Sequence, residues 1–349
     1  MSQVRHHSIF KKFECWKGFV EEGFNVNFLG VKTRAEYACE APPGSGNRFV
    51  ATALPDFDEE YFEWVDLLEA VVGARDRYTM IELGAGYGRW LVNAAAAIRH
   101  IKGPPYRLIG VEAEPTHFRW MKQHMQDNGV KGSDCDLIEA AVNDKDGNVG
   151  FFIGKPSDWY GQRIWQLTDV IPLFLPRRLF RSTLARIGLE RRHSAAQETA
   201  TGNNLSFFQK VAYEIAALNC SLIPRVKEQA DPLYEHSYGR GLGIGRVKAV
   251  GLNTLLRQLD KVDLIDLDVE GSELRVLKPA AGQLNEKVRR LHVGTHNRKI
   301  ESGLRTLFRR NGWKNQFDYP INSNSHTPWG TIRFQNGVQS WINRDLLEA

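Results

Sequence analysis

The stretch that most constrains this chain is TMIELGAGYGRW at residues 79–90. An apolar run leads up to Glu82, and a helical pattern follows over residues 90–101. Between them, glycine recurs at alternate positions, namely Gly84, Gly86 and Gly88. Glycine permits a tight turn and lets a ligand approach the backbone, while the N–H groups of a helix start attract an anionic group. The stretch therefore predicts a strand, a ligand-binding turn and a helix.

The spacing of these glycines bears on the ligand. A dinucleotide fingerprint reads G-x-G-x-x-G, whereas this chain reads E-x-G-x-G-x-G, with Glu82 directly before the turn. A pyrophosphate is negatively charged and would not favour a carboxylate beside it. S-adenosyl-L-methionine (SAM) carries a sulfonium and an ammonium group, and it suits the site better. The alternative is an ordinary strand-to-helix turn in another kind of α/β protein.

The composition is that of an ordinary soluble protein of 349 residues, with 42% hydrophobic and 25% charged residues. The net charge of +5 decides little, because lysine and arginine are spread widely. The four cysteines form no C-x-x-C pair, which favours free thiols in a reducing compartment. Neither a secretory signal nor a membrane-spanning stretch is evident, and we expect a cytoplasmic protein.

A second predicted strand, residues 107–111, ends at Glu112. An acid at this place can accept hydrogen bonds from both ribose hydroxyls of an adenosine ligand. The alternative is a solvated strand-end carboxylate. The third predicted strand, residues 136–142, contains Ala140 and Ala141, which either leave room for an adenine ring or simply pack tightly.

The fourth predicted strand, residues 262–270, carries Asp266, Asp268 and Glu270 at alternate positions. A continuous strand would place all three on one face, where carboxylates repel one another and their pKa values rise. Ligands bind at the carboxyl ends of parallel strands, so this pattern indicates a functional site. The alternative is that Glu270 has left the strand and points to water.

The fifth predicted strand, residues 288–293, leads to His296, a candidate base or metal ligand at the same sheet edge. His292, inside that strand, is interpreted as a core histidine. An Asn-Gly turn within residues 331–343 predicts a terminal antiparallel hairpin. The β-α-β order followed by such a hairpin matches a methyltransferase sheet better than a symmetric dinucleotide fold.

Four segments are expected. Residues 1–75 form an N-terminal helical extension or cap, with helices over residues 10–20 and 58–72. Residues 76–153 form the SAM-binding half of a Rossmann-like domain, and residues 247–349 form its other half. Residues 154–246 break the α/β rhythm and are interpreted as an insertion, serving as a lid or a substrate-specificity region.

Five stretches together resemble the FkbM family of methyltransferases: residues 82–88, 110–115, 141–147, 253–256 and 268–273, the last reading DVEGSE. The resemblance implies a Rossmann-like class I sheet, mostly parallel with a C-terminal antiparallel hairpin. It also implies SAM-dependent methyl transfer, commonly to an oxygen of a sugar, glycan or natural product. Many members carry lysine where this chain has Asp266.

The resemblance also assigns residues to the site. It implies that the SAM site is lined by Glu82, Gly84, Ala85, Gly86 and Gly88, with Glu112 holding the ribose. It places Asp268 and Glu270 at the active-site edge.

For catalysis, we expect Asp268 or His296 to act as a base toward an acceptor hydroxyl, with Glu270 orienting the substrate. In a second version, Asp268, Glu270 and His296 hold Mg²⁺ or Mn²⁺, which acidifies that hydroxyl. The expected partner is a small-molecule or glycan acceptor, without nucleic acid, and a homo-oligomer is compatible with the sequence. Rival interpretations are an NAD-dependent oxidoreductase, and a SAM- or carbohydrate-binding protein without turnover.

Overall fold

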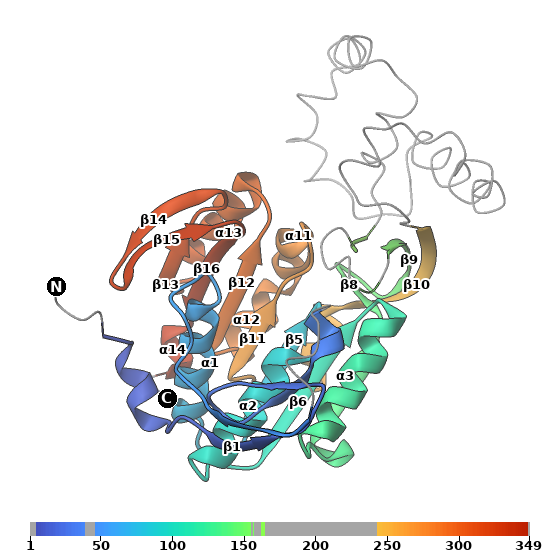
Figure 1. The fold of residues 1–349 in the computed structure, drawn as a ribbon. Coiled ribbons are helices and arrows are strands. Elements are labelled where there is room, and N and C mark those ends of the chain that lie inside the picture. The colour runs from blue at the N-terminus through green and yellow to red at the C-terminus, as the bar shows by residue number, and fades with distance from the viewer. Residues whose placement is uncertain (1–4, 39–45, 155, 157–161, 165–242, 348–349) are drawn as a thin grey trace, which may run out of the picture.

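The centre of the protein is a seven-stranded sheet (Figure 1). The computed structural model describes residues 5–38, 46–154, 156, 162–164 and 243–347. The strand order is β13 (Lys314–Tyr319), β16 (Gly337–Ile342), β12 (Arg290–Thr295), β11 (Leu264–Leu267), β5 (Tyr78–Leu83), β6 (Tyr106–Glu112) and β7 (Cys135–Glu139). The strands from β12 to β7 are parallel, and β16 is antiparallel to both its neighbours. The predicted Rossmann-like fold class is thereby confirmed.

Helices cover both faces of this sheet and divide the core in two (Figure 1). One face packs against α1 (Tyr61–Gly73), α2 (Arg89–His100) and α3 (Pro115–Asp127). The other packs against α10 (Leu252–Arg257), α11 (Glu273–Leu277), α12 (Ala281–Lys287) and α13 (Arg298–Arg310). Every residue of β5 is buried, as a central parallel strand requires, with Met80 in the first core and Ile81 in the second.

Shorter elements surround the sheet. The strands are β1 (Lys17–Val20), β2 (Phe24–Val26), β3 (Lys32–Arg34), β4 (Arg48–Ala51), β8 (Ala141–Asn143), β9 (Gly147–Ile153), β10 (Gly243–Gly251), β14 (Ser323–Thr327) and β15 (Gly330–Phe334). The helical turns are η1 (Ser8–Lys12), η2 (Ala35–Ala38), η3 (Gly132–Asp134), η5 (Lys278–Ala280) and α14 (Arg344–Leu347).

The helix predicted over residues 10–20 is wrong. The chain forms η1 and then β1, which pairs with β4. The aromatic residues have helical spacing, but they lie in different environments. Phe10 and Phe13 are buried in the core, whereas Phe19 is exposed and lies opposite Phe49 on β4. The second predicted helix is confirmed as α1, and the Asp58 carboxylate accepts hydrogen bonds at its start.

Two predictions on the C-terminal half are also wrong. Residues 331–343 are not a hairpin, because β15 pairs with β14 while β16 inserts between β12 and β13. All six residues of β16 are buried, and only a place inside the main sheet provides that environment. The strand predicted over residues 262–270 ends at Leu267, so Asp268 and Glu270 lie beyond it.

The expected insertion, residues 154–246, falls largely outside the described residues. Its flanks are described: β9 and β10 pair antiparallel, with Ile153 opposite Gly243. The chain therefore leaves and re-enters the described fold at two adjacent strand ends. The role of the insertion stays a prediction.

Candidate active site

A cavity of about 680 Å³ opens at the carboxyl ends of β5, β6 and β11. Among the residues that line it are most of those expected from the sequence, namely Glu82, Gly84, Ala85, Gly86, Glu112, Asp268 and Glu270. Its size lies within the range typical of small-molecule sites. Ligands of open α/β sheets bind at this edge, so the cavity is the candidate active site.

The glycine turn forms the floor of the cavity beside β11. Gly84 and Gly86 adopt positive φ angles of 79° and 53°. A Cβ atom on Gly84 would collide with the carbonyl oxygen of Asp268, so the turn can pack against the end of β11 only as glycine. Gly88 is not among the residues that line this cavity, so its role in the SAM site stays a prediction. It precedes α2 with φ 71°, and a Cβ there would lie 2.8 Å from Cγ of Met121.

Glu82 is buried beneath the turn, and its carboxylate points at the start of α2. It accepts hydrogen bonds from the backbone N–H of Leu91 at 3.0 Å and of Trp90 at 3.4 Å. Burial raises its pKa well above the usual value, and these two donors oppose the shift. The prediction that the helix start leaves its N–H groups for a ligand is wrong for these two groups, because Glu82 already occupies them.

Glu112 ends β6 and faces the cavity. Its carboxylate accepts hydrogen bonds from the N–H of Gly86 and of Glu114, each at 2.7 Å. Burial raises its pKa to about 7, against the effect of these donors. Ala140, at the break between β7 and β8, and Ala141 also line the cavity, leaving space beside the acid. A buried carboxylate beside small side chains fits the hydroxyls and the flat ring of an adenosyl group.

The first of two carboxylate–histidine clusters lies where β11 and β12 end. We call Asp268, Glu270 and His296 the strand-end cluster. Nε2 of His296 is 3.3 Å from Oδ1 of Asp268 and 3.6 Å from Oε2 of Glu270. Nδ1 of His296 is 2.8 Å from Oε1 of the fully buried Glu273. The predicted meeting of Asp268, Glu270 and His296 is therefore observed, although Glu270 reaches it from outside the strand with φ 48°.

The electrostatics of this cluster follow from burial and from its one imidazole. Burial lowers the pKa of His296, but Glu273, Asp268 and Glu270 together raise it to about 9. The ring is thus protonated at neutral pH. Burial raises the pKa of Glu270 to about 7, with His296 opposing the shift. The pKa of Asp268 is raised in the same way, although its side chain remains 50% exposed to the cavity.

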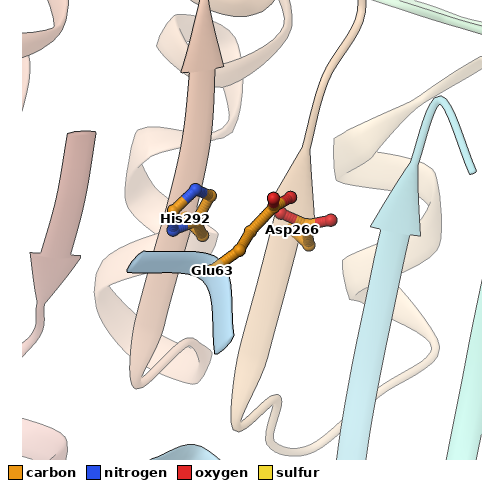
Figure 2. Close-up of side chains that lie close together, drawn as sticks. All are labelled: Glu63, Asp266 and His292. Atoms are coloured by element: carbon orange, nitrogen blue, oxygen red, sulfur yellow. The ribbon is translucent and has the colours of Figure 1, made fainter. Parts of the chain in front are cut away.

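The second cluster was missed as a site by the sequence analysis. Glu63 of α1, Asp266 of β11 and His292 of β12 gather under the sheet edge (Figure 2), and we call them the buried cluster. All three line the cavity. His292 was interpreted as a core histidine, and it is indeed buried, with Nδ1 2.7 Å from Oδ2 of Asp66. Glu63 was not predicted as a site residue because it lies on an amphipathic helix with no motif around it.

A further ion pair at the cavity was also missed. The guanidinium of Arg89 donates to both carboxylate oxygens of Glu60, each at 2.6 Å. Arg89 directly follows the glycine turn, and Glu60 precedes α1, so the pair fastens the N-terminal segment to the turn. No sequence signal linked two residues so far apart.

Some expectations concern the chain as a whole. Within the described residues, no helix is both long and apolar enough to cross a bilayer. Of the cysteines that the structure describes, Cys15 and Cys135 are free.

The fold and the site together define a Rossmann-like class I methyltransferase. The sheet carries a glycine turn after its central strand and an acid at the end of the next strand. Residues 72–312 match the methyltransferase FkbM domain family, and the chain belongs to that family. The predicted family is thus confirmed. Methyl transfer is favoured over the oxidoreductase alternative.

Individual relatives are distant. A protein of Jannaschia sp. (strain CCS1), itself named only by class as a methyltransferase, is 22% identical over 312 residues, covering 89% of each chain. The crystal structure of methyltransferase FkbM from Methylobacillus flagellatus KT aligns with a TM-score of 0.39 and 12% identity, over 77% of this chain and 44% of that one. An O-methyltransferase from Bacillus cereus, solved with SAH, aligns with a TM-score of 0.34 and 9% identity, over 82% of each chain.

Proposed function

We propose that this protein transfers the methyl group of SAM to a hydroxyl oxygen of a sugar, glycan or natural-product acceptor. One observation carries the proposal: Glu112 lines the same cavity as Asp268 and Glu270, the two carboxylates of the strand-end cluster, so a donor site and a proton acceptor share one space. The FkbM family membership supports the donor.

The donor half of the site is assigned to the glycine turn and Glu112. SAM supplies an electrophilic methyl group on a sulfonium. The ionised carboxylate of Glu112 would accept hydrogen bonds from sugar hydroxyls while it keeps those from Gly86 and Glu114. Gly84 and Gly86 allow close approach to the backbone, and Ala140 and Ala141 leave room for a flat ring.

The acceptor half is assigned to the strand-end cluster. An acceptor hydroxyl must lose its proton as its oxygen becomes nucleophilic, and a base within hydrogen-bond reach speeds this step. We assign the base role to Asp268, because its carboxylate is half exposed to the cavity and its raised pKa makes it more basic. His296 remains protonated and stabilises negative charge on the two carboxylates. Glu270 orients the acceptor.

The metal version of this cluster is less favoured. Asp268, Glu270 and His296 each offer a ligand atom, all within 4.8 Å of one another. A protonated imidazole has no lone pair for a metal, so an ion would first have to displace the proton that three carboxylates hold on His296 with a pKa of about 9. The imidazolium of His296 already offsets part of the negative charge of this cluster.

The experiment is methyl transfer from isotopically labelled SAM to a panel of sugars, glycans and hydroxylated natural products. We expect label on an acceptor oxygen, located by fragmentation in mass spectrometry. Amine and thiol analogues of each responsive acceptor serve as matched controls. Label on nitrogen or sulfur alone, or SAM binding with no transfer to any acceptor, would contradict the proposal.

A further inference from the structure

The buried cluster belongs to a row of polar side chains that crosses the sheet at one level. In register, Ser340 of β16 lies opposite His292 of β12, His292 lies beside Asp266 of β11, and Asp266 lies beside Glu82 of β5. Residues paired across strands point to the same face, here the face covered by α1. Glu63 projects from α1 onto this row (Figure 2).

The acids of this group outnumber its one imidazole: Glu63, Asp266 and Glu82 lie with His292 alone. The carboxylates of Glu63 and Asp266 lie side by side (Figure 2), and burial raises the pKa of both. Asp266 is 4% exposed, and its buried Oδ1 has no hydrogen-bond partner among the described residues. Such a group costs about 1–3 kcal/mol when nothing pairs with it.

The nearby arginines form ion pairs with other acids. Arg290 is 2.8 Å from Glu69 and 3.7 Å from Asp66. Arg89 is bound to Glu60. In the described part of the chain, no ion pair reaches Glu63 or Asp266. A cation bound from solution would therefore be attracted by two carboxylates that have no ion-pair partner among the described residues.

His292 is arranged as a ligand. Its Nδ1–H donates to Oδ2 of Asp66, which also accepts a hydrogen bond from Oγ of Ser340. Metal-binding histidines commonly donate one ring N–H to a carboxylate, which fixes the tautomer and leaves the other nitrogen for the metal. Nε2 of His292 takes no hydrogen bond within the described residues, and the residue lines the cavity.

We propose that Glu63, Asp266 and His292 bind one divalent transition-metal ion. One ligand atom from each lies within 4.8 Å of the others, so small side-chain shifts would bring all three to about 2.0–2.2 Å from a shared ion. Two carboxylates and an imidazole suit Mn²⁺, Fe²⁺ or Zn²⁺. Three protein ligands leave a coordination position toward the cavity. The inference does not depend on the proposed methyl acceptor.

The test uses the full chain, stripped with a chelator and dialysed. Mn²⁺ binding is followed by electron paramagnetic resonance and Zn²⁺ binding by calorimetry, with Mg²⁺ as a weaker competitor. We expect one ion per chain. Glu63→Gln and Asp266→Asn should each weaken binding by at least about 100-fold, beyond the loss typical of outer-shell changes. Asp268→Asn, two residues away in the strand-end cluster, is the matched control and should retain the ion.

Two results would overturn the proposal. One is a wild-type protein that takes up neither Mn²⁺ nor Zn²⁺. The other is an ion that survives Glu63→Gln but is lost in Asp268→Asn, which would assign it to the strand-end cluster. Circular dichroism and thermal unfolding of each variant establish that it is folded. If Asp266→Asn does not fold, Glu63→Gln decides alone, because Glu63 is only partly buried on α1.

Discussion

Two carboxylate–histidine clusters border one cavity, and they differ in how their charge is balanced. In the strand-end cluster, the imidazole of His296 lies 3.3 Å and 3.6 Å from the carboxylates of Asp268 and Glu270. In the buried cluster, Nδ1 of His292 is engaged by Asp66, while Glu63 and Asp266 adjoin each other without an ion-pair partner in the described structure.

Similar sets of residues can therefore suit different chemistry. A cluster that contains its own cation and faces the cavity is suited to proton transfer. A more deeply buried cluster with surplus negative charge is suited to a bound cation, since isolated buried charges are costly.

The largest effect is expected for Asp268→Asn. Removing a general base typically lowers the rate by about 10²–10⁴-fold. We expect kcat to fall in this range, while the calorimetric Kd for SAM stays near the wild-type value, because Asp268 is assigned to the acceptor. Wild-type turnover in this variant would remove Asp268 from the base role.

The second prediction concerns stability and the buried cluster. A ligand that binds only the folded state at 100 times its Kd stabilises it by about 2.7 kcal/mol. Mn²⁺ at such a concentration should therefore raise the thermal midpoint of the wild type and of Asp268→Asn. Glu63→Gln should lose most of this gain. An equal gain in all three proteins would place the ion outside the buried cluster.

Glu112→Gln is a control that lies in neither cluster. A hydrogen bond to a charged group contributes about 1.5–3 kcal/mol, so the loss of the charge should weaken SAM binding by roughly 10–100-fold. We expect kcat at saturating SAM and the affinity for Mn²⁺ to change little. A large loss of kcat with unchanged SAM affinity would contradict the ribose assignment.

The pH dependence of SAM binding follows from the same residue. Burial raises the pKa of Glu112 to about 7 in the free protein, and hydroxyl donors favour its ionised form. Binding therefore releases a proton below pH 7. SAM affinity should rise with pH up to about 7, by at most about tenfold per pH unit, and then level off. In calorimetry this slope should vanish in Glu112→Gln; a slope that persists there would implicate another group.

The smallest expected effect is a change in folding stability, and its sign depends on whether the metal ion is bound. In chelated protein, Asp266→Asn removes one of two adjoining carboxylates, and we expect it to stabilise the fold by about 1 kcal/mol. With Mn²⁺ present, the same variant should be less stable than the wild type. Urea unfolding in both conditions measures the change. Destabilisation of equal size in both conditions would mean that Asp266 has only a packing role.

The local sequence predicted much of the part of the cavity that we assign to the donor, because it is built within one β-α-β stretch. The glycine turn, Glu112 and the flanking helices are consecutive in the chain, and their periodicity and spacing are visible in it. The exact contacts were not predictable. Glu82 turned out to bind the N–H groups of α2, and Gly88 packs on Met121 instead of lining the cavity.

The C-terminal strands illustrate the opposite case. An Asn-Gly turn predicts a local hairpin, yet β16 pairs with β12 and β13 in the main sheet and not with β15. Burial of six residues outweighs a local turn preference, and burial depends on which surfaces are available in the folded chain. The same holds for Glu270, which lies beyond the end of β11 although the alternation of acids suggested a continuous strand.

The family, the parallel sheet and the sheet edge at which the cavity opens were predictable from the sequence alone, because these depend on short-range pattern and spacing. Tertiary packing alone brings Glu63, which precedes the family match, to Asp266 and His292 on two adjacent strands. The three residues are far apart in the chain, so no local pattern predicts that they lie together. Packing of α1 on the sheet brings the three together.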